Sequence, residues 1–334
     1  MQINDLGEFG LIDRLTANLK PSANTTILGP GDDCAVLQPD PDKRTLVTTD
    51  LLLEGIHFDL QYVPLTHLGY KAALVNFSDV YAMGGMPRQI TVSLGISSKF
   101  DVESIEALYE GLKLACSEHH VDIIGGDTCA SMNGLSISIT CIGEAAPEDV
   151  VCRSGAHDTD LVCVSGDLGA AYMGLQLLER EKAVYNQQYR EWCQNPAADR
   201  ECPPQFEPDF AGREYLLQRQ LRPEARRDVV LALRQAGIHP TAMMDVSDGL
   251  SSELLHICKA SACGCRIFEE RIPLDYQTAV TAEEVNMNVT TAAMNGGEDY
   301  ELLFTVPLAD YERVQALPGV KVIGHITKPE LGHI

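Results

Sequence analysis

Apolar and polar positions alternate along this chain with two different periods, and each period predicts a type of secondary structure. Apolar residues at helical spacing predict helices over residues 8–19 and 67–83. Apolar and polar residues that alternate one by one predict half-buried strands over residues 90–94 and 135–141. Asp101 is the expected N-cap of a third helix, which runs to about His119. Shorter apolar runs predict two further strands, at residues 45–49 and 121–124.

A domain boundary is expected near residues 145–149. The length agrees, because 334 residues are long for one compact core and suit two domains, at 1–147 and 148–334. After the boundary, a strand at 161–164 and a helix at 169–178 are predicted. Residues 181–212 are rich in Gln, Asn, Arg and Pro, so we expect a surface excursion with an exposed or locally packed Trp192. Alternation of helices and strands then resumes, and the predicted fold class is mixed α/β.

The composition is that of a soluble globular protein, with 45% apolar and 22% charged residues. No apolar run approaches the roughly 20 residues that span a bilayer, and residues 1–5 do not resemble the start of a secretory signal. We therefore expect a cytoplasmic protein without a membrane partner. The eleven cysteines follow no repeating frame and include no CxxC pair, so we expect them to be reduced and mostly buried.

The formal net charge of −23 argues against nucleic acid as a partner. Binding to a duplex depends on Lys and Arg side chains that neutralise phosphates, and this chain has too few. An acidic balance can reflect only a well-solvated surface, or it can reflect carboxylates gathered to hold cations. The positions of the acids distinguish the two interpretations.

Six acidic clusters stand out, because most of them follow an apolar strand-like run or have glycine beside the acid. Glycine lets the backbone approach a ligand closely, and hard divalent cations prefer oxygen ligands. The alternative is ordinary turn chemistry, in which Asp next to Gly is common. Asp79 argues against that alternative because it lies inside a mostly apolar predicted helix, where only a buried salt bridge would otherwise explain it. The clusters are Gly31-Asp32-Asp33, Thr48-Thr49-Asp50, Asn76-Phe77-Ser78-Asp79, Gly125-Gly126-Asp127, Asp245-Val246-Ser247-Asp248-Gly249 and Gly296-Gly297-Glu298-Asp299.

Known nucleotide-binding motifs are missing. The sequence contains no GxxxxGK[ST] loop and no protein-kinase motif set. If the chain handles a nucleoside triphosphate, metal ions must bridge the phosphates to the acids.

In this order and spacing, the clusters resemble those of the thiamine-monophosphate kinase family. The resemblance runs from Gly7-Glu8-Phe9 through Gly324. Besides the acidic clusters, it includes Cys34-Ala35, Gly55-Ile56-His57-Phe58, Tyr70-Lys71-Ala72, Thr128, Arg153-Ser154-Gly155 and Leu250.

The resemblance implies the two-domain fold of aminoimidazole ribonucleotide synthetase, with the N-terminal domain forming a shared barrel in a homodimer. It also implies transfer of a phosphoryl group from ATP to thiamine monophosphate at a cluster of several Mg²⁺ ions, which gives thiamine diphosphate. Carried over by motif, His57 and Glu298 would bind thiamine monophosphate, and Asp50, Asp127 and Asp248 would be catalytic. The metal ligands would be Asp33, Thr48, Thr49, Asp50, Asp79, Asp127, Asp245 and Asp248, and the ATP contacts would be Tyr109, Gly126, Asp127, Arg153 and Ser247.

Two alternatives remain open from sequence. One is another enzyme of the same superfamily, although no reactive cysteine precedes Cys34 and the chain ends Leu331-Gly332-His333-Ile334 without the C-terminal cysteine of hydrogenase-maturation relatives. The other is a non-catalytic cation- or nucleotide-binding protein, which we would expect to have lost one or more acidic clusters. We further expect direct transfer without a phosphoenzyme, because the acceptor phosphate is already largely ionised at neutral pH.

Overall fold

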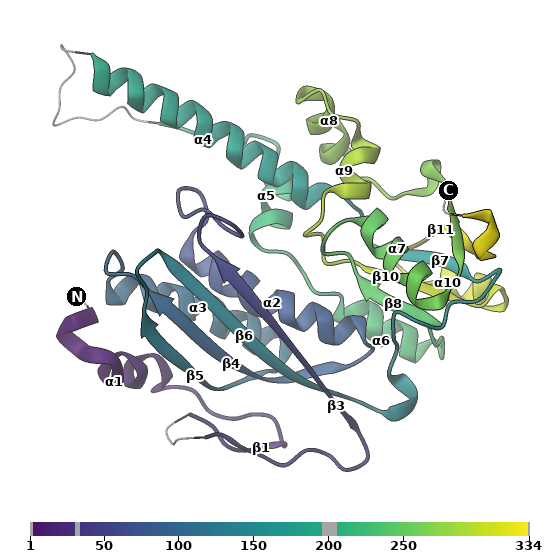
Figure 1. Cartoon of the computed structure of the whole chain (residues 1–334), viewed down its shortest axis with the longest axis horizontal. Helices are drawn as coiled ribbons and strands as arrows, with labels where there is room; N and C mark the ends of the chain where they lie inside the picture. The colour runs from purple at the N-terminus through teal and green to yellow at the C-terminus, as the bar shows by residue number, and fades with distance from the viewer. Residues whose placement is uncertain (1–2, 31–33, 196–205, 333–334) are drawn as a thin grey trace.

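The structure, a computed structural model, describes residues 3–30, 34–195 and 206–332 and has two α/β domains side by side (Figure 1). The predicted metal ligand Asp33 lies outside the described residues. The elements of the first domain are α1 (Ile3–Thr16), β1 (Thr26–Leu28), β2 (Val36–Leu37), β3 (Arg44–Leu53), α2 (Leu65–Ala82), β4 (Met86–Ile96), α3 (Val102–His119), β5 (Asp122–Ala130) and β6 (Leu135–Ala145).

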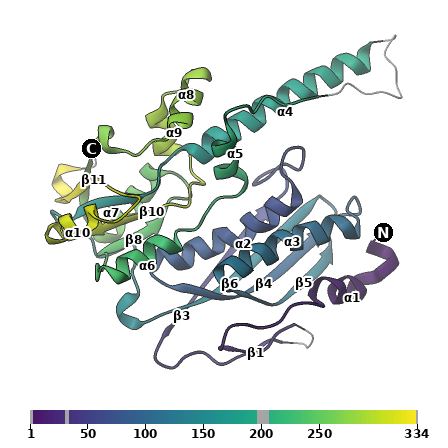
Figure 2. The ribbon, with the colours of Figure 1, turned by 180° about the vertical axis from the view of Figure 1, so that it is seen from behind.

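The first domain is a four-stranded sheet with helices on one face. The strand order is β3-β6-β4-β5, and only β4 and β5 run parallel. Figure 2 shows α2 and α3 lying together across the sheet. Along β6, Leu135, Ile137, Ile139 and Cys141 are fully buried on the helix side, whereas the residues between them are only half-buried. The sheet therefore has one helix-covered face and one open face.

Helices α2 and α3 approach each other more closely than side chains would allow. A Cβ atom on Gly69 would lie 1.9 Å from the carbonyl oxygen of Leu108, and one on Gly111 would lie 1.8 Å from that of Thr66. Glycine at both positions is what permits this contact. This helix contact fixes α2, which carries Lys71, Ser78 and Asp79 of the candidate site described below.

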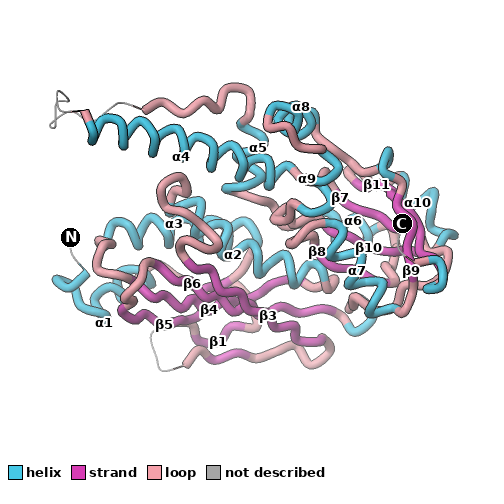
Figure 3. Tube along the Cα trace, turned by 45° about the horizontal axis from the view of Figure 1, so that its top comes forward, coloured by secondary structure: helices cyan, strands magenta, loops and turns pink. Residues whose placement is uncertain are grey.

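The second domain contains a fully antiparallel sheet in the order β8-β10-β7-β11-β9. Figure 3 shows its strands as a group separate from those of the first domain. All residues of the central strands β7 and β10 are buried, so both faces are covered. The elements are β7 (Leu161–Ser165), α4 (Ala170–Gln194), α5 (Glu214–Leu221), α6 (Arg227–Gln235), β8 (Ala242–Asp245), α7 (Leu250–Ser261), β9 (Gly264–Ile267), α8 (Tyr276–Glu284), α9 (Val289–Asn295), β10 (Leu302–Val306), α10 (Tyr311–Gln315) and β11 (Val320–Thr327).

One hydrophobic core continues across the boundary between the domains. Phe77 and Tyr81 of α2 belong to the same buried cluster as Val229 of α6, Met243 of β8 and Phe304 of β10. Burial of apolar surface on this scale stabilises the relative placement of the domains. Side chains from both domains can therefore meet at defined positions along this boundary.

The structure corrects the prediction for residues 181–212. The helix predicted to end at residue 178 continues without interruption to Gln194, and Figure 1 shows its second half projecting away from the body of the molecule. Trp192 lies in its last turn, with its ring 5.5 Å from that of Tyr189. Residues 181–194 are thus helix rather than irregular excursion, and part of the remainder lies outside the described residues.

Two strands are longer than predicted, and this changes where their acids lie. β3 continues to Leu53, so Asp50 lies inside the strand rather than at its end. β5 continues through Gly125 and Gly126 to Ala130, so Asp127 is also within a strand. The helix predicted to start after Asp101 is confirmed, with the Asp101 side chain accepting the backbone N–H of Ser104.

None of the helices in the described residues is both long and apolar enough to cross a membrane.

Candidate active site

Three predicted acids from three different elements meet between the domains. Asp50 comes from β3, Asp79 from α2 and Asp245 from the last position of β8. All three line one cavity of about 170 Å³. The Thr48 hydroxyl donates to Asp79 Oδ2 at 2.5 Å, and the Ser78 hydroxyl donates to Asp245 Oδ2 at 2.6 Å. The first domain and the second domain therefore build this group of acids together.

Burial destabilises the charged forms of all three acids, and the charge of Asp79 adds to this for Asp50 and Asp245. Burial, with the charge of Asp79 added, raises the pKa of Asp50 to about 6. Burial and the same neighbour raise the pKa of Asp245 to about 7. Burial also raises the pKa of Asp79, although the Thr48 hydroxyl and the charge of Arg153 act in the opposite direction. The group has an excess of negative charge that its protein neighbours do not balance.

The chemistry of this group fits a hard divalent cation. Its donors are the carboxylates of Asp50, Asp79 and Asp245 and the hydroxyl of Thr48, all oxygen, as Mg²⁺ prefers. Within residues 3–30, 34–195 and 206–332, no three His, Cys, Asp or Glu side chains are close enough to hold a metal ion as they stand. The group therefore matches Mg²⁺ in ligand type and in charge, but its side chains as placed do not form a coordination sphere.

Neighbouring residues of β3 point to opposite faces of the sheet, and this separates Thr48 from Thr49. Thr48 and Asp50 lie on the helix-covered face, next to Asp79 of α2. Thr49 lies on the open face, where its hydroxyl donates to the carbonyl oxygen of Ile139 at 3.1 Å. The hydroxyl of Thr49 therefore does not join the acids.

Asp127 is not part of this group within one chain. The strand register places Asp127 in one row with Ser93, Ser138 and Leu51, and places Asp50 in the adjacent row. Adjacent rows point to opposite faces, and β5 is three strand spacings from β3, or about 14 Å. The two predicted catalytic acids Asp50 and Asp127 therefore lie apart and on different faces of the sheet.

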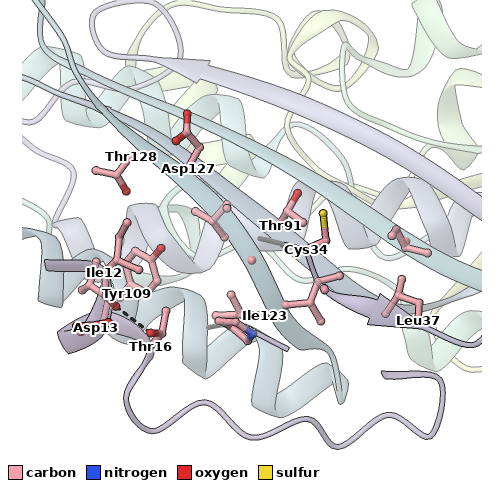
Figure 4. A pocket seen from close by; sticks show the side chains of 18 residues that line it. Ile12, Asp13, Thr16, Cys34, Leu37, Thr91, Tyr109, Ile123, Asp127 and Thr128 are labelled. Atoms are coloured by element: carbon pink, nitrogen blue, oxygen red, sulfur yellow. Dashed lines mark hydrogen bonds between the residues drawn. The ribbon is translucent and has the colours of Figure 1, made fainter. Parts of the chain in front are cut away.

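A second region surrounds Asp127. Gly126 and Asp127 line a cavity of about 790 Å³ beside β5, together with Tyr109 of α3 and residues of α1. Figure 4 shows Tyr109 beside Ile12 and Asp13, with Asp127 turned away from it. Three of the five predicted ATP contacts thus share one region, which we call the β5 cavity.

The other two predicted ATP contacts lie with the acids. Arg153 lines a cavity of about 420 Å³ whose walls include Thr48, Asp79 and Asp245. Ser247 lines the 170 Å³ cavity. Asp248 is exposed and lines neither of these cavities, while its backbone N–H donates to Glu253 Oε1 at 2.9 Å.

The two predicted substrate contacts lie at the other side of the acids. His57 Nδ1 accepts the backbone N–H of Leu53 at 3.0 Å, so the neutral ring has its remaining donor at Nε2. Glu298 Oε2 accepts from Lys71 Nζ at 3.0 Å and from Gln220 Nε2 at 2.9 Å. Burial opposes ionisation of Glu298, but Lys71 and Gln220 together hold its pKa below the usual range.

The backbone around Glu298 is held in an unusual conformation. Glu298 has a φ of 60° and Tyr300 has a φ of 53°. Both values lie in the left-handed region, which residues other than glycine seldom adopt. Backbone hydrogen bonds from Glu298 to Ser247 and from Tyr300 to Val246 hold the segment against the strand-helix turn after β8. Such strain is maintained only where the surroundings impose it, and it is common at functional sites.

His57, Lys71 and Glu298 line the 170 Å³ cavity and also a further cavity, of about 490 Å³. Its walls include Phe58, Tyr62 and Tyr172, so it is partly aromatic. The 420, 170 and 490 Å³ cavities are neighbours, because each shares lining residues with the next, and we call the three together the interdomain cleft. It has Arg153 at one end, the acids in the middle and an aromatic compartment at the other end.

Sequence reasoning did not assign a role to Lys71, Ser78 or Gln220, all of which contact predicted site residues. Lys71 had a usable signal, since it is a charged residue in an apolar helix, as Asp79 is. In contrast, Asp299 of the last acidic cluster is structural. It accepts the backbone N–H of Gly169 at 2.7 Å, at the start of α4, and lies 3.5 Å from Arg219.

Comparison with known proteins follows the same division into two domains. Residues 31–145 match the family model of AIR synthase related protein, N-terminal domain, and residues 207–333 match that of the C-terminal domain. Thiamine-monophosphate kinase from Aquifex aeolicus (strain VF5) is 34% identical over 339 residues, covering 99% of this chain and 98% of that protein. The chain belongs to the thiamine-monophosphate kinase family. The alternative of another enzyme of the same superfamily is thereby set aside at the level of family.

Solved structures of this family share the fold over nearly the whole chain. Thiamine-monophosphate kinase from Stenotrophomonas maltophilia K279a has a TM-score of 0.77 at 30% identity and covers 97% of this chain and 95% of that one. The structure described as AaThiL complexed with AMPPCP and TMP has a TM-score of 0.74 at 34% identity and covers 100% and 94%. The predicted two-domain AIR synthase-related fold is confirmed.

Proposed function

We propose that this chain transfers the γ-phosphoryl group of ATP to thiamine monophosphate, giving ADP and thiamine diphosphate, the last step in making thiamine diphosphate. The observation that carries the proposal is the order of compartments in the interdomain cleft, in which acids from both domains separate Arg153 from an aromatic compartment. The relative complexed with AMPPCP and TMP supports the assignment of an ATP analogue and thiamine monophosphate to such a fold.

The aromatic compartment suits the thiamine part of the acceptor. Tyr62 and Tyr172 line this compartment, and aromatic rings attract flat heterocycles and cations, as the Lys182 ammonium 5.3 Å from the centre of the Tyr62 ring illustrates. Asp59, Glu179 and Glu298 in its wall outnumber Lys71 and Lys182, with which they pair, and the remaining negative charge favours a cationic thiazolium. With the rings held there, the phosphate of the acceptor would extend towards Asp50, Asp79 and Asp245.

The acids would hold several Mg²⁺ ions. Asp50, Asp79, Asp245 and the Thr48 hydroxyl form the assembled part of this set, and Asp33, Asp127, Asp248 and a backbone oxygen of Thr49 would complete it. Bound Mg²⁺ neutralises phosphate charge and aligns the oxygens of an in-line displacement. This matters because two like unit charges about 4 Å apart repel by roughly 4 kcal/mol at an effective dielectric near 20.

The protein groups would bind and orient both substrates. Arg153 and the Ser247 hydroxyl would donate hydrogen bonds to the phosphates of ATP, and His57 Nε2 and Glu298 would fix the acceptor. No side chain needs to remove a proton from the acceptor phosphate, which is already largely ionised at neutral pH. We therefore propose direct transfer, and recovery of a phosphorylated protein after incubation with radiolabelled ATP alone would contradict it.

A homodimer would bring the two regions of the site together. The open face of the first sheet exposes apolar side chains, with Val47 65% and Leu51 53% exposed. Covering this face with the same face of a second copy would form a closed barrel without free edges. With its two-fold axis along the strands, such a barrel would bring edge strand β5 of one copy next to edge strand β3 of the other. Asp127 of one copy and Asp50 of the other would then lie on neighbouring strands, although on opposite faces of the barrel wall.

A coupled assay for ADP release, with and without thiamine monophosphate, tests the proposed reaction. We expect release of ADP only when both thiamine monophosphate and Mg²⁺ are present, with thiamine diphosphate formed in equal amount. ADP release that ignores thiamine monophosphate would overturn the acceptor assignment. No ADP release under any condition, together with measurable ATP binding, would favour the non-catalytic alternative.

A further inference from the structure

Lys71 places a positive charge in the middle of the interdomain cleft. It lies on α2 with 7% of its surface exposed. Its Nζ atom donates to the carbonyl oxygen of Gln220 at 2.9 Å and to Glu298 Oε2 at 3.0 Å. Both acceptors belong to the second domain, so this ammonium group reaches across the domain boundary.

The position of Lys71 along the cleft is distinctive. It lines both the 170 Å³ cavity, which contains the acids, and the 490 Å³ aromatic compartment. In the wall of the 170 Å³ cavity, as far as the structure describes it, Lys71 is the one Lys or Arg side chain among Asp50, Asp79, Asp245 and Glu298. The junction of the two cavities is therefore marked by a fixed cation surrounded by acids.

The ammonium group retains hydrogen-bonding capacity. An ammonium has three N–H donors, and the described residues supply two acceptors to Lys71, from Gln220 and Glu298. One donor is left for a ligand at the junction. Glu298 and Gln220 fix the position of Nζ, so binding such a ligand would require little further ordering of the side chain.

We propose that Lys71 binds the phosphate of the acceptor through this third donor and thereby positions its attacking oxygen. The inference rests on the proposed function and extends it to a residue that the acidic motifs do not assign. With the thiamine rings in the aromatic compartment, the phosphate must cross the junction to reach the acids. A charged hydrogen bond from Lys71 to that phosphate offsets the repulsion from Asp50, Asp79 and Asp245.

A purely structural role for Lys71 makes a different prediction. If Lys71 only holds Glu298 and joins the domains, its loss should weaken binding of phosphorylated and unphosphorylated thiamine equally. If it binds the phosphate, only the phosphorylated ligand should lose affinity. The ratio of the two affinities therefore separates the roles without reference to turnover.

The experiment measures binding of thiamine monophosphate and of thiamine by titration calorimetry, with Mg²⁺ and without ATP, to the full chain and to Lys71→Met. We expect thiamine monophosphate to bind about 10- to 100-fold more weakly to the variant, while the affinity for thiamine changes little. An equal loss for both ligands, or no loss for either, would overturn the proposal.

Three further variants keep the result interpretable. Lys71→Gln can still donate to Glu298, so it tests the same loss of preference should Lys71→Met prove too unstable to purify. Glu298→Gln removes the ion pair but keeps Lys71, and should retain the preference for the phosphorylated ligand. Lys182→Met changes a lysine at the wall of the aromatic compartment that does not line the 170 Å³ cavity, and should also retain it.

The outcome is independent of the kinase assignment. Loss of the phosphate preference in Lys71→Met, in a protein that releases no ADP, would support the role of Lys71 and reject the proposed function. Kinase activity in the wild type with an unchanged preference in Lys71→Met would support the proposed function and reject the role of Lys71.

Discussion

The two edge strands of the first sheet, β3 and β5, carry similar acidic motifs, but only the motif on β3 lies in the interdomain cleft. On β3, Thr48-Thr49-Asp50 faces α2 and joins Asp79 and Asp245 in the interdomain cleft. On β5, Gly125-Gly126-Asp127 borders an open cavity on the other edge, and Asp127 shares a row with exposed Ser93. One chain assembles the β3 region, whereas Asp127 of the β5 region lies outside the interdomain cleft.

This difference shows what a motif does not specify. An acid that follows an apolar run is marked as a candidate ligand, but the strand register decides which face it joins. For β3, the helix-covered face leads to the second domain. Asp127 of β5 lies on the open face, which we propose is covered by a second copy of the chain.

The largest expected effect is at Asp50. Asp50→Asn removes a charged ligand from the assembled group, so we expect turnover to fall by about 10³-fold or more, with the fold intact by circular dichroism. Glu110→Gln, an exposed acid on α3, is the control and should keep full activity. Near-normal turnover of Asp50→Asn at millimolar Mg²⁺ would show that the β3 region is not the metal site.

Mixing two inactive variants tests whether the β3 and β5 regions act across a dimer. We expect Asp127→Asn to be inactive like Asp50→Asn. If sites form between copies, unfolding and refolding the two variants together should restore about a quarter of wild-type turnover, since half the dimers are mixed and each has one intact site. Refolded samples of each variant alone are the control. A mixture as inactive as its components would mean that Asp127 acts within its own chain or not at all.

A smaller effect is expected on the stability of the metal-free protein when one acid of the group Asp50, Asp79 and Asp245 is replaced. The pKa of Asp245, about 7, lies above that of an unfolded aspartate, so the folded state binds more protons between roughly pH 4 and 7. Stability should therefore fall as pH rises through this range. We expect Asp245→Asn to raise the unfolding temperature at pH 8 by about 1–2 °C for each 1 kcal/mol of relieved burial penalty and repulsion.

Calorimetry at two pH values, in the presence of a chelator, measures this gain. The gain should shrink near pH 5, where Asp245 of the wild type is already protonated. Adding Mg²⁺ at pH 8 should raise the unfolding temperature of the wild type more than that of the variant. A destabilised Asp245→Asn at pH 8 without metal would contradict a cost of keeping Asp245 ionised in the folded state.

The smallest effect is expected at Asp248. This residue is exposed and lies outside the cavities of the cleft, so Asp248→Asn should lower turnover by about 10-fold at limiting Mg²⁺. Raising the Mg²⁺ concentration should recover most of the loss. A deficit as large as that of Asp50→Asn, unchanged by added Mg²⁺, would place Asp248 among the essential ligands.

Much of the fold could be predicted from local patterns. The alternation in residues 135–141 reflects one buried and one half-buried face, and the N-cap at Asp101 is a local hydrogen bond. The continuation of α4 beyond residue 178 to Gln194 was not predictable in this way, because this part of the helix is polar. Within it, Tyr185 and Tyr189 stack on each other. Apolar periodicity marks burial, and a projecting helix buries little along its outer half.

The candidate site was predictable as a set of residues but not as an arrangement. Asp50, Asp79 and Asp245 were identified from their motifs, and the structure brings them into one cavity. The separation of Asp127 and the outward direction of Thr49 depend on strand length and register, which single motifs do not contain. Lys71 was overlooked because its partners, Gln220 and Glu298, lie far away in the sequence and meet it only through tertiary packing.

The alternation along β3 also constrains how the gene can change. Thr48, Asp50 and Leu52 face inward, and Thr49 and Leu51 face outward, so a single codon lost or gained within the strand would exchange the two sets. Val47 or Thr49 would then take the place of Thr48, and Thr49 or Leu51 that of Asp50, so the inward carboxylate would be lost although almost no residue had been substituted. Insertions and deletions should accordingly be tolerated in the turn at residues 131–134, but not in β3, where the length of the strand matters as much as the identity of its residues.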